Sequence, residues 1–205
     1  MTACTRFLWA STCGLVLAGC GGGEDDAPPV DCSVFTAAAV SPYLLPWHVG
    51  QTYVSHPHLT WDPTVQRYAI DAPMPIGTDV LAMRSGTVVR VQESFFDNDV
   101  TPGHENYLYV QHDDGTVARY FHLTHDGALL QVGDAVRQAE PIGRSGHTGN
   151  SSAPHLHFDV TRSCCAEPPA GNAMPTGETL PLSFGHATPD SSCGIVEGVS
   201  YTAQP

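Results

Sequence analysis

The sequence contains no lysine and has little positive charge. Its eight basic residues are all arginines, and against 21 acidic residues they leave a net charge of −13. Binding to nucleic acid needs a basic surface, and so does a polybasic contact with anionic lipid headgroups. The sequence therefore excludes nucleic acid as a partner and gives no reason to expect a polybasic membrane patch.

Long helical patterns are also missing, since no amphipathic stretch longer than two turns stands out, while 20 Gly and 17 Pro predict many turns. Between residues 68 and 161, short alternating or β-branched runs are broken by Gly, Asp and Pro, which is typical of antiparallel strands. We therefore predict an all-β, mainly antiparallel domain with few short helices. Asp113-Asp114-Gly115 is predicted to form a hairpin turn, because Gly accepts the positive φ of a tight turn.

The N-terminal apolar segment is too short to span a membrane permanently. Arg6 precedes an apolar run that ends at Leu17-Ala18-Gly19-Cys20, which predicts a lipoprotein signal peptide cleaved before an acylated Cys20. This predicts anchoring by lipid in a bacterial cell envelope, on the periplasmic side with the outer membrane favoured, or outside the cell. We separately expect a monomer. The predicted divisions of the chain are a signal peptide (1–19), the lipidated Cys with a flexible linker (20–30), a lead-in segment (31–60) and the β domain (61–205).

The remaining cysteines predict disulfides rather than a metal cluster. Four remain once the signal is removed and Cys20 carries lipid, and no C-x-x-C spacing supports a metal. In an oxidising compartment they can form two disulfides in three connectivities. Because adjacent cysteines rarely bridge each other, we expect Cys164 and Cys165 each to tie down one terminal segment, through Cys32 and Cys193.

Several polar side chains fall at strand positions that can build a reactive site. His155 and His157 lie in a strand-like run, and a period of two puts both imidazoles on one face. His122 ends a second predicted strand, and Asp71 ends a third. Taken singly, each has a plainer explanation as an exposed strand histidine or a turn carboxylate. Together they could supply three ligands with an open fourth position, as catalytic zinc requires.

In order and spacing, the motifs resemble those of the lysostaphin/LytM-type zinc metallopeptidases, which cut peptidoglycan peptides. The runs that carry the resemblance are RYAIDAPMPIGTDVLAMRSGTVVRV, RYFHL, VGDAVRQAEPIGRSGHTGNSSAPHLHFDV, LPLSF and EGVSYT. The resemblance implies a compact antiparallel β fold with a groove across the sheet and one Zn²⁺ per chain. It implies Asp71 and His157 as zinc ligands, with His122 and His155 beside the reacting water and scissile carbonyl. From the Gly-rich stretch 143–149 itself, we expect a border of the groove, with Gly146, Thr148 and Asn150 as substrate contacts.

One position departs from that pattern. The family usually places its first zinc ligand four residues before the aspartate, in H-x-x-x-D, and Arg67 stands there in this chain. A guanidinium has no lone pair for a metal, so either the site is inactive or another histidine fills in. His56 and His58 lie upstream of Asp71. We expect His56 to be the third ligand, with His58 as the alternative.

Three functions from different classes stay open. The first is an active endopeptidase of the cell envelope, in which zinc activates water and His155 or His122 moves the proton. The second is a metal-free relative that binds peptidoglycan or activates another hydrolase, which Arg67 favours. The third is a structural envelope lipoprotein with incidental histidines. Because Asp71, His122 and the His155/His157 pair occur together, we expect the first, with peptidoglycan peptides as substrate and a lipid anchor in the membrane.

Overall fold

The computed structural model describes residues 31–59, 66–163 and 178–205, and its strands confirm the predicted antiparallel β fold. Residues 31–205 group as one compact unit. Within the described residues, the helical elements are the 3-10 helices η1 (Cys32–Val34) and η2 (Ala38–Val40). The strands are β1 (Thr52–Pro57), β2 (Ile70–Pro73), β3 (Asp79–Leu81), β4 (Gly86–Gln92), β5 (Tyr107–Gln111), β6 (Val117–Phe121), β7 (Leu123–Ala128), β8 (Ala135–Val136), β9 (Pro141–Ser145), β10 (His155–Thr161), β11 (Ala187–Thr188) and β12 (Val199–Ala203).

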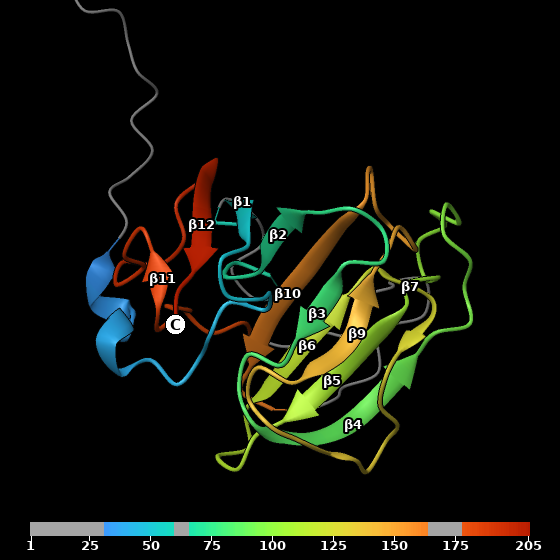
Figure 1. The fold of residues 1–205 in the computed structure, drawn as a ribbon, viewed down its shortest axis with the longest axis horizontal. Helices are drawn as coiled ribbons and strands as arrows, with labels where there is room; N and C mark the ends of the chain where they lie inside the picture. The colour runs from blue at the N-terminus through green and yellow to red at the C-terminus, as the bar shows by residue number, and fades with distance from the viewer. Residues whose placement is uncertain (1–30, 60–65, 164–177) are drawn as a thin grey trace, which may run out of the picture. The chain divides into compact units, whose positions relative to one another are not determined.

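Two sheets enclose the main core. The larger sheet has nine strands in the order β11-β12-β1-β2-β10-β6-β5-β4-β8, and the smaller has three in the order β3-β9-β7. In Figure 1 the smaller sheet lies over the part of the larger sheet formed by β6, β5 and β4. Leu156, Phe158 and Val160 of β10 pack in one core with Val80 of β3 and Ile142 of β9. The core therefore fills the space between the two sheets.

The opposite face of the larger sheet carries the polar strand positions. In β10, His155, His157 and Asp159 alternate with the core residues, so their side chains point away from the core. Asp71 of β2 pairs directly with His157, and Arg119 of β6 pairs directly with Asp159. Directly opposed residues of antiparallel strands lie side by side on one face. The sheet register therefore gathers these charged and titratable groups over the centre of the sheet.

The predicted hairpin turn is confirmed at Asp113-Asp114-Gly115, between β5 and β6. Gly115 has a φ of +84°, and the His112 amide donates to the Thr116 carbonyl at 2.8 Å. The Asp114 carboxylate accepts a hydrogen bond from the Thr116 amide at 3.0 Å. The turn thereby sets β5 and β6 in register, and β6 leads directly into the site at its far end.

Residues 31–59 belong to the β domain. Leu45 and Trp47 lie in the main core, and the Trp47 ring packs edge-on against Phe158, with 6.2 Å between ring centroids. Strand β1 pairs with both β2 and β12. The boundary expected at residue 60 therefore does not separate two units, because the chain on its two sides shares one sheet and one core.

Cys32 and Cys193 form a disulfide with each other, with their Cα atoms 4.6 Å apart. The prediction that these two cysteines pair with Cys164 and Cys165 is therefore wrong. The physical reason is that β1 and β12, from opposite ends of the chain, are neighbours in the sheet, so the terminal segments meet. Cys164 and Cys165 lie outside the described residues, as does the N-terminal segment with Cys20.

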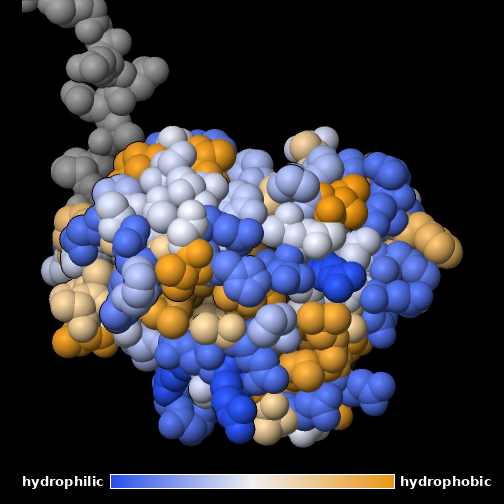
Figure 2. All heavy atoms as spheres, in the orientation of Figure 1, coloured by the Kyte–Doolittle hydropathy of each residue, from blue (hydrophilic) through white to orange (hydrophobic). Residues whose placement is uncertain are grey.

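Polar and apolar residues are distributed differently between the surface and the core. Across the described ranges, no helix combines the length and apolar character needed to cross a membrane. The face drawn in Figure 2 mixes hydrophilic and hydrophobic residues over its whole extent, without gathering the apolar ones in one area. Most large apolar side chains that the structure describes are instead packed in the core between the sheets.

Candidate metal centre

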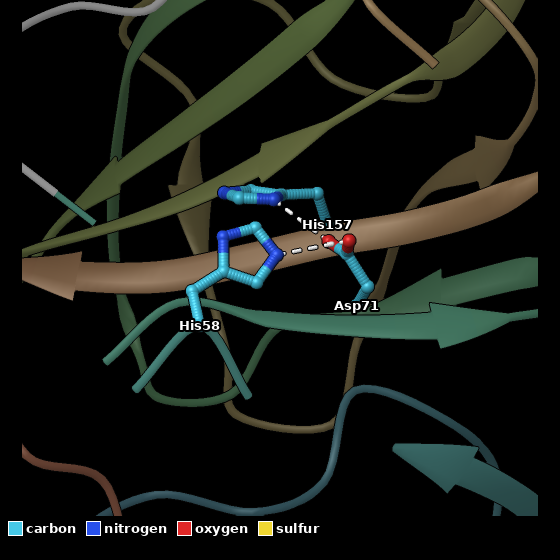
Figure 3. A group of neighbouring side chains, drawn as sticks. All are labelled: His58, Asp71 and His157. Atoms are coloured by element: carbon cyan, nitrogen blue, oxygen red, sulfur yellow. Dashed lines mark hydrogen bonds and ion pairs between the residues drawn. The ribbon is translucent and has the colours of Figure 1, made fainter. Parts of the chain in front are cut away.

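Three side chains from neighbouring strands meet over the centre of the larger sheet. His58 follows β1, Asp71 lies on β2 and His157 lies on β10, and one potential ligand atom of each lies within 4.8 Å of the others. His58 Nε2 is 2.9 Å from Asp71 Oδ2, and His157 Nδ1 is 2.8 Å from Asp71 Oδ1. Figure 3 shows both imidazole rings directed at the Asp71 carboxylate. Two imidazoles and one carboxylate are a donor set of catalytic zinc sites.

The two upstream histidines differ in side-chain contacts and burial, although the register of β1 and β2 sets His56 directly opposite Asp71. The backbone amide of His58 donates to the Ala69 carbonyl at 2.9 Å, which continues the strand pairing beyond β1, and the His58 side chain is buried. His56, the predicted third ligand, instead has Nδ1 2.6 Å from Glu197 Oε1, on a side chain that is 42 % exposed. The structure therefore corrects the expected arrangement: His58, the alternative, lies beside Asp71, and His56 faces Glu197.

Arg67 lies outside the cluster, at the position where the resemblance places a ligand. Arg67 is exposed, and its guanidinium lies over the Tyr68 ring, 5.8 Å from the ring centroid. This placement agrees with the chemistry of the guanidinium, which offers donors and no lone pair. The cluster of His58, Asp71 and His157 does not include Arg67.

Burial and close contacts fix the charges in the cluster. Burial raises the pKa of Asp71, but the hydrogen bonds from His157 and His58 outweigh it and hold that pKa well below its ordinary value. Burial also lowers the pKa of His157, but the carboxylates of Asp159 and Asp71 outweigh it and raise that pKa to about 9. At neutral pH the cluster therefore pairs a carboxylate with a proton-bearing ring, and a metal cation can take the place of that proton.

Two further histidines stand next to the cluster. The rings of His122 and His155 have centroids 4.5 Å apart, and His155 Nε2 is 3.5 Å from Asp71 Oδ1. His122 Nδ1 donates to the Thr148 carbonyl at 2.6 Å, and His155 Nδ1 donates to the Ala153 carbonyl at 2.8 Å. A carbonyl oxygen can only accept, so each neutral ring carries its proton on Nδ1. The Nε2 lone pair of each ring is therefore available.

Both of these rings are neutral near pH 7. Burial lowers the pKa of His122 to about 3, with the nearby His155 and His157 adding to the effect. Burial also lowers the pKa of His155. His122 has a φ of +60° at the junction of β6 and β7, a conformation uncommon outside glycine that is found at functional sites. The fold thus holds two unprotonated bases beside a candidate metal site.

A cleft of about 280 Å³ opens over these groups. Of the three residues expected to contact substrate, Asn150 lines it. Thr148 is fully buried: its hydroxyl donates to the Leu123 carbonyl and accepts from the Asn106 amide, both at 3.0 Å. Gly146 is also buried, and a Cβ there would lie 2.4 Å from the Thr124 nitrogen. Thr148 and Gly146 therefore support the cleft wall from behind. The cleft is lined by His58, Gln66, Asp71, His122, Asn150, Ser152, His155 and His157.

Sequence reasoning missed three of the residues around this site. Gln66 and Ser152 line the cleft, and no motif in the sequence pointed to either of them. Asp159 lies next to His157, with 3.8 Å between Asp159 Oδ2 and His157 Nε2. The same period of two that grouped His155 with His157 could have added Asp159 to that face.

Residues 65–169 match the model of peptidase family M23. The chain belongs to this family. The matched range contains Asp71, His122, His155 and His157, whereas His58 lies before it. The M23 chain is 36 % identical over 90 residues to the peptidoglycan DD-endopeptidase ShyA of Vibrio cholerae, which covers 44 % of this chain and 19 % of that protein. It is 36 % identical over 109 residues to lysostaphin of Staphylococcus simulans, which covers 53 % of this chain and 20 % of that protein.

The M23 chain spans about a fifth of the length of the curated relatives that it matches. Among solved structures, the catalytic domain of lysostaphin from Staphylococcus simulans is 29 % identical to it. That comparison covers 64 % of the M23 chain and 88 % of the lysostaphin domain, with a TM-score of 0.42. The similarity to the full-length curated relatives is therefore confined to a part of each.

Proposed function

We propose that this protein is a zinc metalloendopeptidase that hydrolyses peptide bonds in peptidoglycan. The observation that carries the proposal is the cluster of His58, Asp71 and His157 at one cleft with the neutral bases His122 and His155. Membership of peptidase family M23 supports it, and so do relatives named peptidoglycan DD-endopeptidase and lysostaphin.

The three clustered residues fit a zinc ion. His58 Nε2, His157 Nδ1 and an Asp71 oxygen lie together, and three such ligands leave the fourth position for water or substrate. His157 Nε2 is buried with no hydrogen-bond partner in the described part of the chain, so the ring can keep a proton there while Nδ1 binds metal. When bound, zinc would supply a Lewis acid that polarises a carbonyl and lowers the pKa of water to about 7.

His122 and His155 are suited to the proton transfers. Each ring is oriented by its Nδ1 hydrogen bond to a backbone carbonyl and presents an unprotonated Nε2. We assign to them the removal of a proton from the attacking water and its delivery to the leaving amine, a role that typically contributes about 10²- to 10⁴-fold. After taking up the proton, the Nε2–H can also donate to the oxyanion that forms on the scissile carbonyl. Asn150 and Ser152, on the cleft wall, can bind the substrate's peptide groups.

Zinc content and digestion of cell walls test this proposal. We expect the full chain, purified with its disulfides formed, to hold about one zinc per chain in elemental analysis. It should release soluble peptides from purified sacculi, lose this activity to a chelator and regain it with zinc, and His157→Ala should lose both zinc and activity. Absence of zinc after reconstitution contradicts the proposal. Tight binding to sacculi without metal or hydrolysis would instead favour a non-catalytic peptidoglycan-binding role.

We also propose that the chain is anchored in the cell envelope through a lipid on Cys20. The support is the apolar N-terminal run that ends in Leu17-Ala18-Gly19-Cys20. Mass spectrometry of the protein from the membrane fraction should find an N-terminus at Cys20 that carries acyl chains. Density separation of the membranes should find it with the outer membrane. We expect the folded domain on the periplasmic side or outside the cell. A mature protein with an unmodified Cys20, or with Cys20 removed, would contradict the anchor.

A further inference from the structure

We propose that Asp159, held in place by Arg119, is the residue that positions His157 as a zinc ligand. The proposal rests on the proposed function, because it concerns how the protein prepares this ring for the metal. Asp159 does not line the cleft and is not one of the three clustered residues; it acts through His157. It is therefore a positioning residue, and its role can be measured apart from catalysis.

The first observation is the rigid placement of the Asp159 carboxylate. Asp159 is fully buried, and its cross-strand partner Arg119 has a side chain that is 3 % exposed. Arg119 Nε donates to Asp159 Oδ1 at 2.7 Å, and Arg119 Nη2 donates to Asp159 Oδ2 at 2.6 Å. Two parallel hydrogen bonds from a planar guanidinium fix both oxygens of a carboxylate. Asp159 therefore has one orientation, set by the pairing of β10 with β6.

The second observation is what this orientation presents to His157. Asp159 Oδ2 lies 3.8 Å from His157 Nε2, while His157 Nδ1 faces Asp71 on the other side of the ring. Among the residues that the structure describes, His157 Nε2 is buried and makes no hydrogen bond. The ring packs edge-on against Phe121, with 5.4 Å between centroids. The two nitrogens of one buried ring thus face two different carboxylates.

The chemistry of a ligating imidazole connects these observations. If Nδ1 gives its lone pair to a metal, the ring proton must be on Nε2, and a buried N–H needs an acceptor. Asp159 Oδ2 is the carboxylate oxygen beside it, and a movement of less than about 1 Å closes the gap to a hydrogen bond. Arg119 in turn balances the charge of Asp159, which would be costly to bury alone. The period of two along β10 puts Asp159 and His157 on one face, and the ion pair with Arg119 then fixes the carboxylate oxygen that lies beside His157 Nε2.

The two roles can be separated by removing both charges at once. Replacing a buried ion pair by apolar side chains of similar size is often neutral or stabilising, so the double variant Arg119→Met/Asp159→Leu should remain folded. We expect its metal-free Tm to stay close to that of the wild-type chain. Its dissociation constant for zinc, measured by competition with a chromophoric chelator on the full chain, should rise about 10- to 100-fold.

A control variant tests whether the loss of any ion pair lowers the zinc affinity. Asp114→Asn breaks the ion pair with Arg84 at the β5–β6 turn, outside the metal centre, and should leave the zinc affinity unchanged. Wild-type zinc affinity in the folded double variant would overturn the role of Asp159. If the wild-type chain itself takes up no zinc, the proposed function fails, which is a different outcome.

A crystal structure of the zinc-loaded wild-type chain gives a second test that does not depend on the folding of any variant. We expect His157 Nε2 and Asp159 Oδ2 to lie within about 3.2 Å of each other, with Nδ1 on the metal. A separation that stays near 3.8 Å, or a different acceptor at Nε2, would overturn the proposal even though zinc is bound. Should the double variant fail to fold, this distance decides.

Discussion

The residues of the candidate metal centre come from two regions of the chain, and only one of these regions matches the family model. Asp71 and His157 lie within residues 65–169, the range that matches the M23 family, whereas His58 comes from residues 31–59, before that range. The first region carries its ligands in linear motifs. The second is joined to it by the pairing of β1 with β2 and by a shared core. His58 therefore lies beside Asp71 and His157 although it stands outside the matched range.

The same comparison accounts for Arg67. The family's usual ligand position lies inside the matched range, but in this chain it carries an exposed guanidinium that cannot bind a metal. The strand next to β2 supplies an imidazole to the same Asp71 carboxylate, at 2.9 Å. Under the proposed function, His58 would take the place of the ligand that Arg67 cannot supply.

The largest expected effect comes from removing the ligand of the upstream region. His58→Ala should weaken zinc binding by more than about 100-fold, beyond the range for changes around the ligands, and should abolish hydrolysis of sacculi. His56→Ala is the matched control two residues away, and it should keep both zinc and activity because its ring faces Glu197. Chelator competition on the two variants makes the comparison. Equal losses, or a larger loss in His56→Ala, would return the ligand to the position first predicted.

The next largest effect is a loss of stability, and it tests whether residues 31–59 are part of the folded core. Trp47 is 1 % exposed and packs against Phe158 of β10. Trp47→Ala should lower the free energy of unfolding by about 3–5 kcal/mol, the cost of a large cavity. Urea denaturation of the metal-free chain measures it. A loss below about 1 kcal/mol, typical of surface substitutions, would show that this region only covers the domain.

The disulfide gives a smaller effect and separates stability from metal binding. Cys32→Ala/Cys193→Ala should lower the free energy of unfolding by about 2–4 kcal/mol, because the link constrains the unfolded chain. The zinc affinity should not change, since His58 is held by strand pairing and not by the disulfide. Thermal unfolding and chelator competition on the same variant check both halves. A fall in zinc affinity would mean that the disulfide sets the position of His58.

The smallest expected effect is a pH dependence of the free energy of unfolding. It arises away from the metal centre, where residues 31–59 contact the β5–β6 turn. His112, at the β5–β6 turn, packs against Tyr43, and burial lowers the pKa of His112 below its ordinary 6.5. As the pH falls below about 6.5, the unfolded chain takes up this proton before the folded chain does, so stability should decline until the folded pKa is passed. His112→Asn keeps a donor toward the Ser85 carbonyl and should flatten the decline in urea midpoints between pH 7.5 and 5.5. Identical slopes in the two proteins would contradict it.

Features that depend on residues close together in the sequence could be predicted, whereas features that depend on the pairing of distant segments could not. The antiparallel strands, the turn at Gly115 and the shared face of His155 and His157 depend on neighbouring residues, and local patterns carry them. The choice between His56 and His58 depends on which ring is buried against Asp71 and which faces Glu197, and the register does not settle it, because His56 is the residue directly opposite Asp71.

Other misses have the same origin. The Cys32–Cys193 disulfide depends on β1 meeting β12, strands from opposite ends of the chain. Thr148 lies in a Gly-rich stretch typical of a cleft wall, yet its hydroxyl is used to hold Leu123 and Asn106. Features set by packing between distant segments were therefore the ones that the sequence left open or misplaced.

Anomalous diffraction at the zinc edge, from crystals of the full chain grown with zinc, would locate the metal relative to His58, Asp71 and His157. We expect one strong peak bonded by His58 Nε2, an Asp71 oxygen and His157 Nδ1, with N–Zn distances of about 2.0–2.1 Å. No peak at this cluster in crystals saturated with zinc would contradict this expectation. So would a metal bonded by His56 in place of His58.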